Sequence, residues 1–198
     1  MKKHNKIAFF LTWILISSVL CSCQRFLPGY EPDYAAMAKD YLNQWGEKYT
    51  EEFSILYRGD RYEASMADII PMIFESSEVR CMLYIEHGFL KDSVAGGGIS
   101  HPNPTNINEK YSMYDLGWGP TCSRLMIVWG DNRGGEADYY ILRCDEEEIR
   151  VDLEANYFCN VHEVFGEGQV MPKNGCAYFY SADGTELTYT GATFWYTE

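Results

Sequence analysis

The chain has 198 residues, of which 46% are hydrophobic and 16% are aromatic. Acidic residues outnumber basic ones by 29 to 16, which gives a formal net charge of −13 at pH 7. A surface this acidic repels nucleic acid and anionic lipid headgroups, so the composition argues against DNA or RNA as a partner. It permits cationic peptides, cations or neutral glycans as ligands and favours none of them.

The first residues of the chain predict export. Lys2, Lys3 and Lys6 form a positively charged start, and the 14 residues from 7 to 20 are almost wholly apolar. This pattern is typical of a secretory signal peptide. A helix that crosses a bilayer needs about 20 apolar residues, so the run is short for a permanent span. An uncleaved signal anchor is the alternative.

The signal ends in Leu20-Cys21-Ser22-Cys23. This tetrapeptide resembles the lipobox of bacterial lipoproteins, in which an aliphatic residue, a tolerant position and a small residue precede a cysteine. Cys21 departs from the pattern, because a small uncharged residue is commoner at that position. The resemblance covers residues 1–23 and implies that residues 1–22 are removed and that Cys23 is lipidated. It also implies a lipid anchor on the exported side of a bacterial membrane, the outer membrane in a Gram-negative cell.

Cleavage before Cys23 leaves a mature chain of 176 residues with 13 basic and 29 acidic residues, a formal charge of −16. We expect residues 23–31 to be the lipidated cysteine and a tether, followed by a single α+β domain over residues 32–198. Eight tether residues span at most about 28 Å, which keeps the domain close to the membrane. Phe26, Leu27 and Tyr30 are then able either to touch the headgroups or to pack on the domain.

One helix is predicted from Asp33 to Trp45. Its apolar residues recur at helical spacing and form one stripe, which consists of Tyr34, Met37, Ala38, Tyr41, Leu42 and Trp45. Pro32 and Asp33 suit a helix start, and Gly46 suits its end. A stripe of this kind usually faces the core, so we expect the helix to pack across a sheet.

After this helix the apolar period changes to two, which predicts strands joined as hairpins. The alternation is clearest over residues 149–154, and turn residues cluster at 131–135, 145–148 and 182–184. Residues 66–74 are ambiguous, because Pro71 argues against a central strand. Strands are expected at 53–57, 79–86, 124–129, 138–144, 149–154, 157–165, 176–180, 186–190 and 194–197. The predicted fold is an N-terminal helix on a mostly antiparallel sheet of about six to eight strands, which can curl toward a barrel.

The stretch from Gly96 to Thr121 is expected to be a long loop. It holds three consecutive glycines from Gly96 and the aromatic residues Tyr111, Tyr114 and Trp118. Loops this long are uncommon in compact domains, and they are either functional or disordered. Tyr and Trp combine a flat apolar body with a polar edge, which suits binding surfaces. We therefore take these three aromatic residues as the candidate binding site, with core packing as the alternative.

Five cysteines follow Cys23, and export places them where disulfides persist. An odd number leaves at least one thiol unpaired, and buried free cysteines are common. Cys122 with His101 or His162 is the candidate for a thiol hydrolase, although no local signature of such enzymes surrounds it. Cys159 and His162 are three residues apart, and on a strand they face opposite sides. The sequence predicts no metal site and no cofactor.

The leading hypothesis is a membrane-anchored, non-catalytic binding or accessory lipoprotein of the cell envelope. Its partner would be an envelope protein, a peptide or a glycan, contacted through exposed aromatic residues. An envelope thiol hydrolase that uses Cys122 and a histidine is one alternative. An inhibitor or immunity-type lipoprotein with an acidic contact surface is another.

Overall fold

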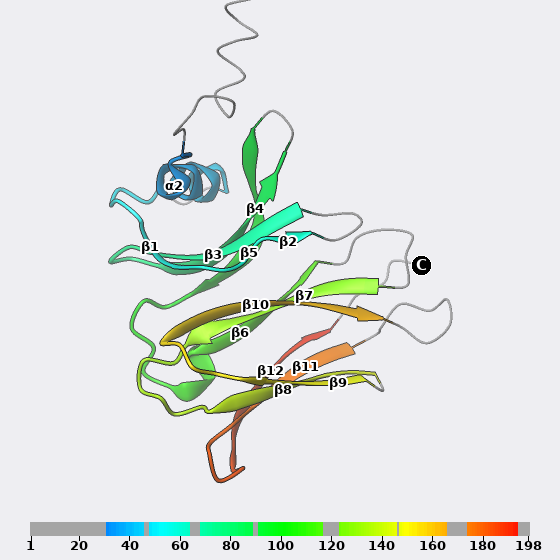
Figure 1. Ribbon diagram of the computed structural model, residues 1–198. Coiled ribbons are helices and arrows are strands. Elements are labelled where there is room, and N and C mark those ends of the chain that lie inside the picture. Colours follow the sequence, from blue (N-terminus) through cyan, green and yellow to red (C-terminus); the bar gives the residue numbers. More distant parts are fainter. Residues whose placement is uncertain are drawn as a thin grey trace, which may run out of the picture.

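The computed structural model describes residues 31–45, 48–63, 68–88, 91–116, 123–145, 147–165 and 174–193. Three antiparallel sheets lie on one another, and one helix covers the free face of the first sheet (Figure 1). The predicted export signal, Cys23, the predicted tether up to residue 30 and the strand expected at 194–197 lie outside the described residues. The layers are therefore a helix, a five-stranded sheet, a three-stranded sheet and a four-stranded sheet.

The five-stranded sheet has the order β1-β3-β4-β5, and β2 pairs with β3 beyond the end of β1. All of its pairings are antiparallel, so β3, β4 and β5 form a meander with β5 at the edge. Its strands are β1 (Ser54–Arg58), β2 (Tyr62–Glu63), β3 (Asp68–Glu75), β4 (Arg80–His87) and β5 (Asp92–Ser100).

The other two sheets join strands that are distant in the sequence. The three-stranded sheet has the order β10-β7-β6 and contains β6 (Tyr111–Leu116), β7 (Ser123–Asp131) and β10 (Tyr157–Phe165). The four-stranded sheet has the order β12-β11-β8-β9 and contains β8 (Tyr139–Cys144), β9 (Glu147–Asp152), β11 (Asn174–Tyr180) and β12 (Glu186–Thr193). A short 3-10 helix, η2 (Ile107–Glu109), precedes β6.

The helix α2 (Tyr34–Gln44) forms where the apolar stripe predicts it. The Asp33 side chain accepts a hydrogen bond from the Ala36 N–H at 3.0 Å, which satisfies one of the free donors of the first turn. Tyr34, Ala38 and Leu42 are buried against the five-stranded sheet. The helix is not N-terminal in the chain, because 33 residues precede it. No helix of the described ranges is long and apolar enough to cross a membrane.

The three layer interfaces each have an apolar core. Strand alternation sends successive residues of the three-stranded sheet to opposite sides, toward the five-stranded sheet or toward the four-stranded sheet. Trp129 and Ile127 are buried on the first side, and Met126 and Val128 on the second. Both faces of this middle sheet are thus covered, which explains the continuous apolar run of β7.

A buried ion-pair network links the first two sheets. Arg80, only 2% exposed, lies on β4 and donates to Glu75 and, at 2.8 Å, to Asp131 at the end of β7. Arg133 also binds Asp131, and the guanidinium groups of Arg80 and Arg133 both lie over the Tyr157 ring. Burial raises the pKa of Asp131, but the two arginines lower it more, so the carboxylate stays charged.

The structure corrects the predicted sheet. The strands form three open sheets instead of one sheet that curls, because β10 returns to pair with β7 and β11 returns to pair with β8. Residues 96–116 are not one loop, since residues 96–100 end β5, residues 107–109 form η2 and residues 111–116 form β6. Residues 101–106 form an irregular connection, and residues 117–121 of the predicted loop lie outside the described residues.

Pro71 lies in a central strand, contrary to the prediction. Along the edge of β3 that faces away from β4, residues 72–75 pair with β1 and residues 68 and 69 pair with β2. Pro71 therefore lies at the break between the two partners. The Pro71 carbonyl accepts a hydrogen bond from the Gly59 N–H at 2.9 Å. The proline nitrogen, which carries no hydrogen, faces the same break, so the sheet loses no hydrogen bond there.

Candidate functional site

A groove runs between helix α2 and strand β5. It has two chambers, of about 420 and about 600 Å³, that share Tyr49 and Ile99. The larger chamber includes polar side chains near the end of β5, which are Lys48, Glu78, Ser100 and His101. The smaller chamber is lined by uncharged residues, which are Tyr41, Leu42, Trp45, Tyr49, Leu83, Gly96, Gly97, Ile99 and Tyr114.

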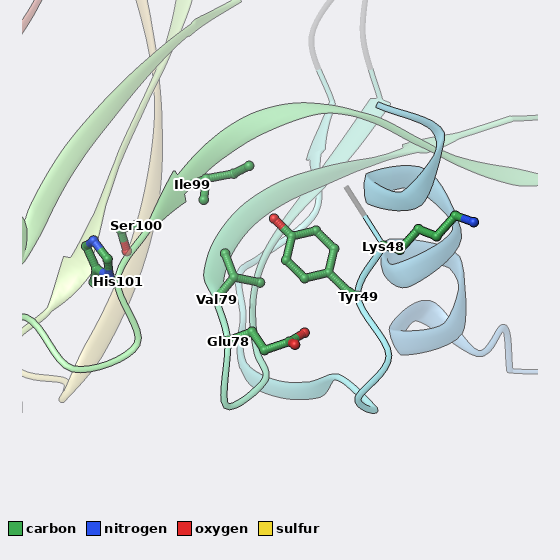
Figure 2. A pocket seen from close by; sticks show the side chains of 7 residues that line it. All are labelled: Lys48, Tyr49, Glu78, Val79, Ile99, Ser100 and His101. Carbon is green, nitrogen blue, oxygen red and sulfur yellow. The ribbon is translucent and has the colours of Figure 1, made fainter. Parts of the chain in front are cut away.

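The helix side of the groove is an aromatic wall. Tyr41 and Trp45 lie on the flank of α2 with their ring centroids 6.1 Å apart. Tyr49 follows the helix end, and its backbone N–H donates to the Asn43 side chain at 2.8 Å, while its ring packs edge-on against buried Phe53. Figure 2 shows the Tyr49 ring between the helix and the strand end that carries Ile99, Ser100 and His101.

The floor of the groove is made of glycine because the strands approach closely there. A Cβ atom on Gly97 would overlap the backbone oxygen of Met82 on β4. A Cβ atom on Gly96 would overlap the hydroxyl of Tyr114, which reaches β5 from the three-stranded sheet. Burial raises the pKa of Tyr114, and the backbone amide of Gly97 partly offsets this effect. Both glycines are half-buried and line the smaller chamber with their backbone.

Two apolar side chains of the groove are unusually exposed. Trp45 is 75% exposed and Ile99 is 60% exposed, although both are large and apolar. An exposed apolar pair beside a concave, aromatic-lined site is a recognised mark of ligand binding. The arrangement suits the burial of an uncharged ligand surface.

The three predicted binding residues are not brought together. Tyr114 lines the smaller chamber, but Tyr111 is only 3% exposed. The Tyr111 ring stacks on Phe179 with centroids 4.1 Å apart, and its hydroxyl donates to Asn132 at 2.9 Å, so it is a core residue. Trp118 lies outside the described residues.

The groove also contains residues that the sequence analysis assigned to the core. Tyr41 and Trp45 belong to the apolar stripe of the helix, yet only Tyr34, Ala38 and Leu42 of that stripe are buried. The apolar stripe is wider than the surface through which one helix contacts a sheet. This excess width was the signal in the sequence that some residues of the stripe, here Tyr41 and Trp45, lie outside the core. Nothing in the sequence pattern distinguished Tyr49 or Ile99 from core residues.

The two candidate histidines lie in different layers. His101 is exposed at the groove, whereas His162 on β10 faces the four-stranded sheet and lies 2.6 Å from the Tyr140 hydroxyl. Asn160 donates to that hydroxyl at 3.1 Å, which directs the hydroxyl hydrogen toward Nε2 of His162. Burial lowers the pKa of His162 to about 4, so the ring is neutral at pH 7. Cys122 lies outside the described residues.

The four described cysteines, which are Cys81, Cys144, Cys159 and Cys176, are free. The three buried ones lie in three different layer interfaces and therefore cannot pair with one another. Burial raises the pKa of Cys81 and of Cys144 to about 12, and it raises that of Cys159 as well. A nucleophilic thiol needs a lowered pKa, so these three are packing residues.

Strand β10 separates Cys159 from His162, as the alternation predicts. Cys159 faces the five-stranded sheet, whereas His162 contacts Tyr140 of the four-stranded sheet. Within the described ranges, no three His, Cys, Asp or Glu side chains gather closely enough to hold a metal ion.

The outer face of the four-stranded sheet carries a second set of aromatic side chains. Tyr139 stacks on Tyr180 with centroids 5.1 Å apart, and the guanidinium of Arg150 lies 3.7 Å from the Tyr139 ring centre. In a second stack, Arg143 covers Tyr178, which in turn stacks on Tyr189. These rings pack against one another and against arginine side chains across neighbouring strands, and such cross-strand pairs commonly stabilise a sheet.

No protein family, curated protein or solved structure matches the chain.

Proposed function

We propose that the chain is an exported lipoprotein whose folded part is a binding module, with the groove between α2 and β5 as its ligand site. The observation that supports the site is the uncharged, aromatic-lined chamber beside the exposed Trp45 and Ile99. Removing apolar surface from water contributes about 25 cal/mol per Å², so a ligand that covers both side chains gains from their burial. The Cys23 anchor would hold this site near a bacterial membrane on the exported side.

The groove is tested by truncating its most exposed aromatic residue. Full-length protein is titrated with a panel of neutral oligosaccharides and end-blocked peptides, and binding is followed by calorimetry. A panel member that occupies the groove should bind the Trp45→Ala variant at least about tenfold more weakly, as is usual for a central aromatic contact. Trp45 is so exposed that its truncation should leave the fold intact.

Phe165→Ala is the matched control, because Phe165 is also a large apolar residue, 60% exposed, but lies at the end of β10. If Phe165→Ala binds as well as the wild type does, the loss of binding in Trp45→Ala is specific to the groove. If no panel member binds, or if Trp45→Ala binds as well as the wild type, the groove is not the ligand site.

The lipid anchor is tested separately by the intact mass of protein extracted from its native membrane. Thiols are first alkylated under denaturing conditions without reduction. We expect the mass of residues 23–198 plus acyl chains, with at least four alkylated cysteines because four described thiols are free. The mass of the uncut chain, or of a chain without lipid, would remove the anchor and leave the groove proposal standing.

A further inference from the structure

We infer that the ligand of the groove is an extended, uncharged segment of another polypeptide, which adds as a strand to the free edge of β5. This inference depends on the proposed function of the groove and names its ligand class. It follows from three properties of the site, which are the edge position of β5, the two-sided lining of the chamber and its lack of charge.

Strand β5 is the last strand of its sheet, and among the described residues no strand pairs with its other side. Its one charged residue is the first, Asp92, which lies 2.7 Å from His87, and residues 93–100 carry no charge. Natural proteins usually protect edge strands with charged side chains, proline or a covering segment. The edge of β5 lacks the first two of these protections over eight consecutive residues.

The smaller chamber surrounds this edge from both sides of the sheet. Tyr41 and Leu83 line it from the side of the helix, whereas Tyr114 reaches it from β6 on the opposite side. A ligand strand paired with β5 would send alternate side chains to opposite sides. One set would lie against Tyr41 and Trp45, and the other would meet Tyr114. An extended chain therefore fits both halves of the chamber at once.

The backbone of β5 is accessible at this point. Gly96 and Gly97 line the chamber without side chains, so their backbone forms part of its surface. As an edge strand, β5 has main-chain groups on its open side that no described strand pairs with. In strand addition such main-chain groups supply the affinity, and side-chain pockets supply the specificity.

The chemistry of the partner follows from the lining. None of the described residues that line the smaller chamber is charged, so they offer no counter-ion to a charged ligand side chain buried there. The chain as a whole has a net charge of −13, which disfavours acidic ligands further. An uncharged segment with aliphatic or aromatic side chains at alternate positions matches the site.

The test uses a pool of random octapeptides blocked at both ends, which are passed over immobilised full-length protein without detergent. Retained peptides should be uncharged and should carry apolar residues at every second position. N-methylation of a retained peptide should weaken binding at least tenfold at alternate residues and much less at the residues between them. Trp45→Ala and Ile99→Lys should both lose the retained peptides, whereas Phe165→Ala should keep them.

Other outcomes overturn the inference in distinct ways. N-methyl effects without a period of two would exclude strand addition while the groove remains a ligand site. Neutral oligosaccharides that bind in a Trp45-dependent manner, with no peptide retained, would show a glycan groove. A dimer that Ile99→Lys converts to a monomer would make a second copy of the chain the occupant. If no peptide or oligosaccharide binds, or if Trp45→Ala binds them as well as the wild type does, the proposed function of the groove is wrong as well.

Discussion

The two outer surfaces of the layered fold are both rich in tyrosine, but the tyrosine rings have different surroundings on each. On the outer face of the four-stranded sheet, Tyr139 and Tyr178 each lie between an arginine and another ring. On the helix side, Tyr41, Trp45 and Tyr49 stand around a chamber. Aromatic rings that cover one another stabilise a sheet, whereas rings that surround a hollow are available to a ligand.

The edge strands of the two outer sheets show the same contrast. In β9, at the edge of the four-stranded sheet, four of six residues are charged, and Arg143 and Arg150 form ion pairs with Glu148 and Asp152. In β5 the last eight residues carry no charge. The charged edge is protected against pairing with another strand, and the uncharged edge is open to it. The following predictions test this difference between the two sides.

The largest effect is expected at Gly97, where β5 lies against β4. Gly97→Ala should destabilise the protein by about 3 kcal/mol, because the added Cβ overlaps the Met82 backbone oxygen and backbone cannot turn aside as a side chain can. Urea unfolding followed by circular dichroism measures the change. Gly134→Ala is the control, since its Cβ would meet only the flexible carboxylate of Glu136. Equal unfolding midpoints for both variants would show that the floor of the groove is not tightly packed.

The next effect concerns His162, whose neutral ring is buried on the far side of the molecule. Its pKa is about 4 in the folded protein and about 6.5 in the unfolded chain. Between these values the unfolded chain binds more protons, so the free energy of unfolding falls as the pH drops from about 6.5 to about 4. The loss amounts to about 3 kcal/mol at pH 4 and is absent above pH 7.

His162→Gln isolates this contribution, because glutamine does not titrate and is able to accept the hydrogen bond from Tyr140. Its free energy of unfolding should depend less on pH between 4 and 6.5 than that of the wild type. His101→Gln is the control, since His101 is exposed at the groove. An unchanged pH dependence in His162→Gln would mean that the pKa of the imidazole is the same in the folded protein and in the unfolded chain.

Much of the fold could be predicted from local patterns. The helix stripe and the alternation at β9 were sufficient for those elements, because each depends on the period of its own residues. The division into three sheets was not predictable, since β10 pairs with β7 and β11 with β8 across long stretches of sequence. The place of Pro71 depended on where β1 ends and β2 begins, which no local pattern records.

The site was predictable only in part. Tyr114 lines the groove, but the glycines belong to an edge strand instead of a loop. Tyr111 and Tyr114 are three residues apart on β6, and strand alternation sends them to opposite faces of the sheet. Had the segment been recognised as a strand, the shared site would have been excluded at once. On the helix side, the excess width of the apolar stripe was the one signal for Tyr41 and Trp45, whereas Tyr49 left none.

A smaller effect is expected from the stack of Arg150 on Tyr139. A double-mutant cycle with Arg150→Met and Tyr139→Leu should give a coupling of about 0.5 to 1 kcal/mol, as for other exposed cation–π pairs. Urea unfolding of the four proteins measures it. The cycle that pairs Arg143→Met with Tyr139→Leu is the control, because Arg143 lies over Tyr178 instead. Equal couplings in the two cycles would mean that the stacks do not act as separate pairs.

The smallest effect on stability is expected when a charge is added to the edge strand β5 and charges are removed from the edge strand β9. Ile99→Lys places a charge on β5, and since Ile99 is largely exposed, the free energy of unfolding should change by less than about 0.5 kcal/mol. Glu148→Thr with Arg150→Val removes two charges from β9 and should promote association through that edge, which light scattering detects. If the β9 variant stays monomeric while the wild type associates through β5, edge charge is not what separates the two sides. The aromatic lining of the groove would then be the deciding property, because a strand added at β5 also contacts Tyr41, Trp45 and Tyr114.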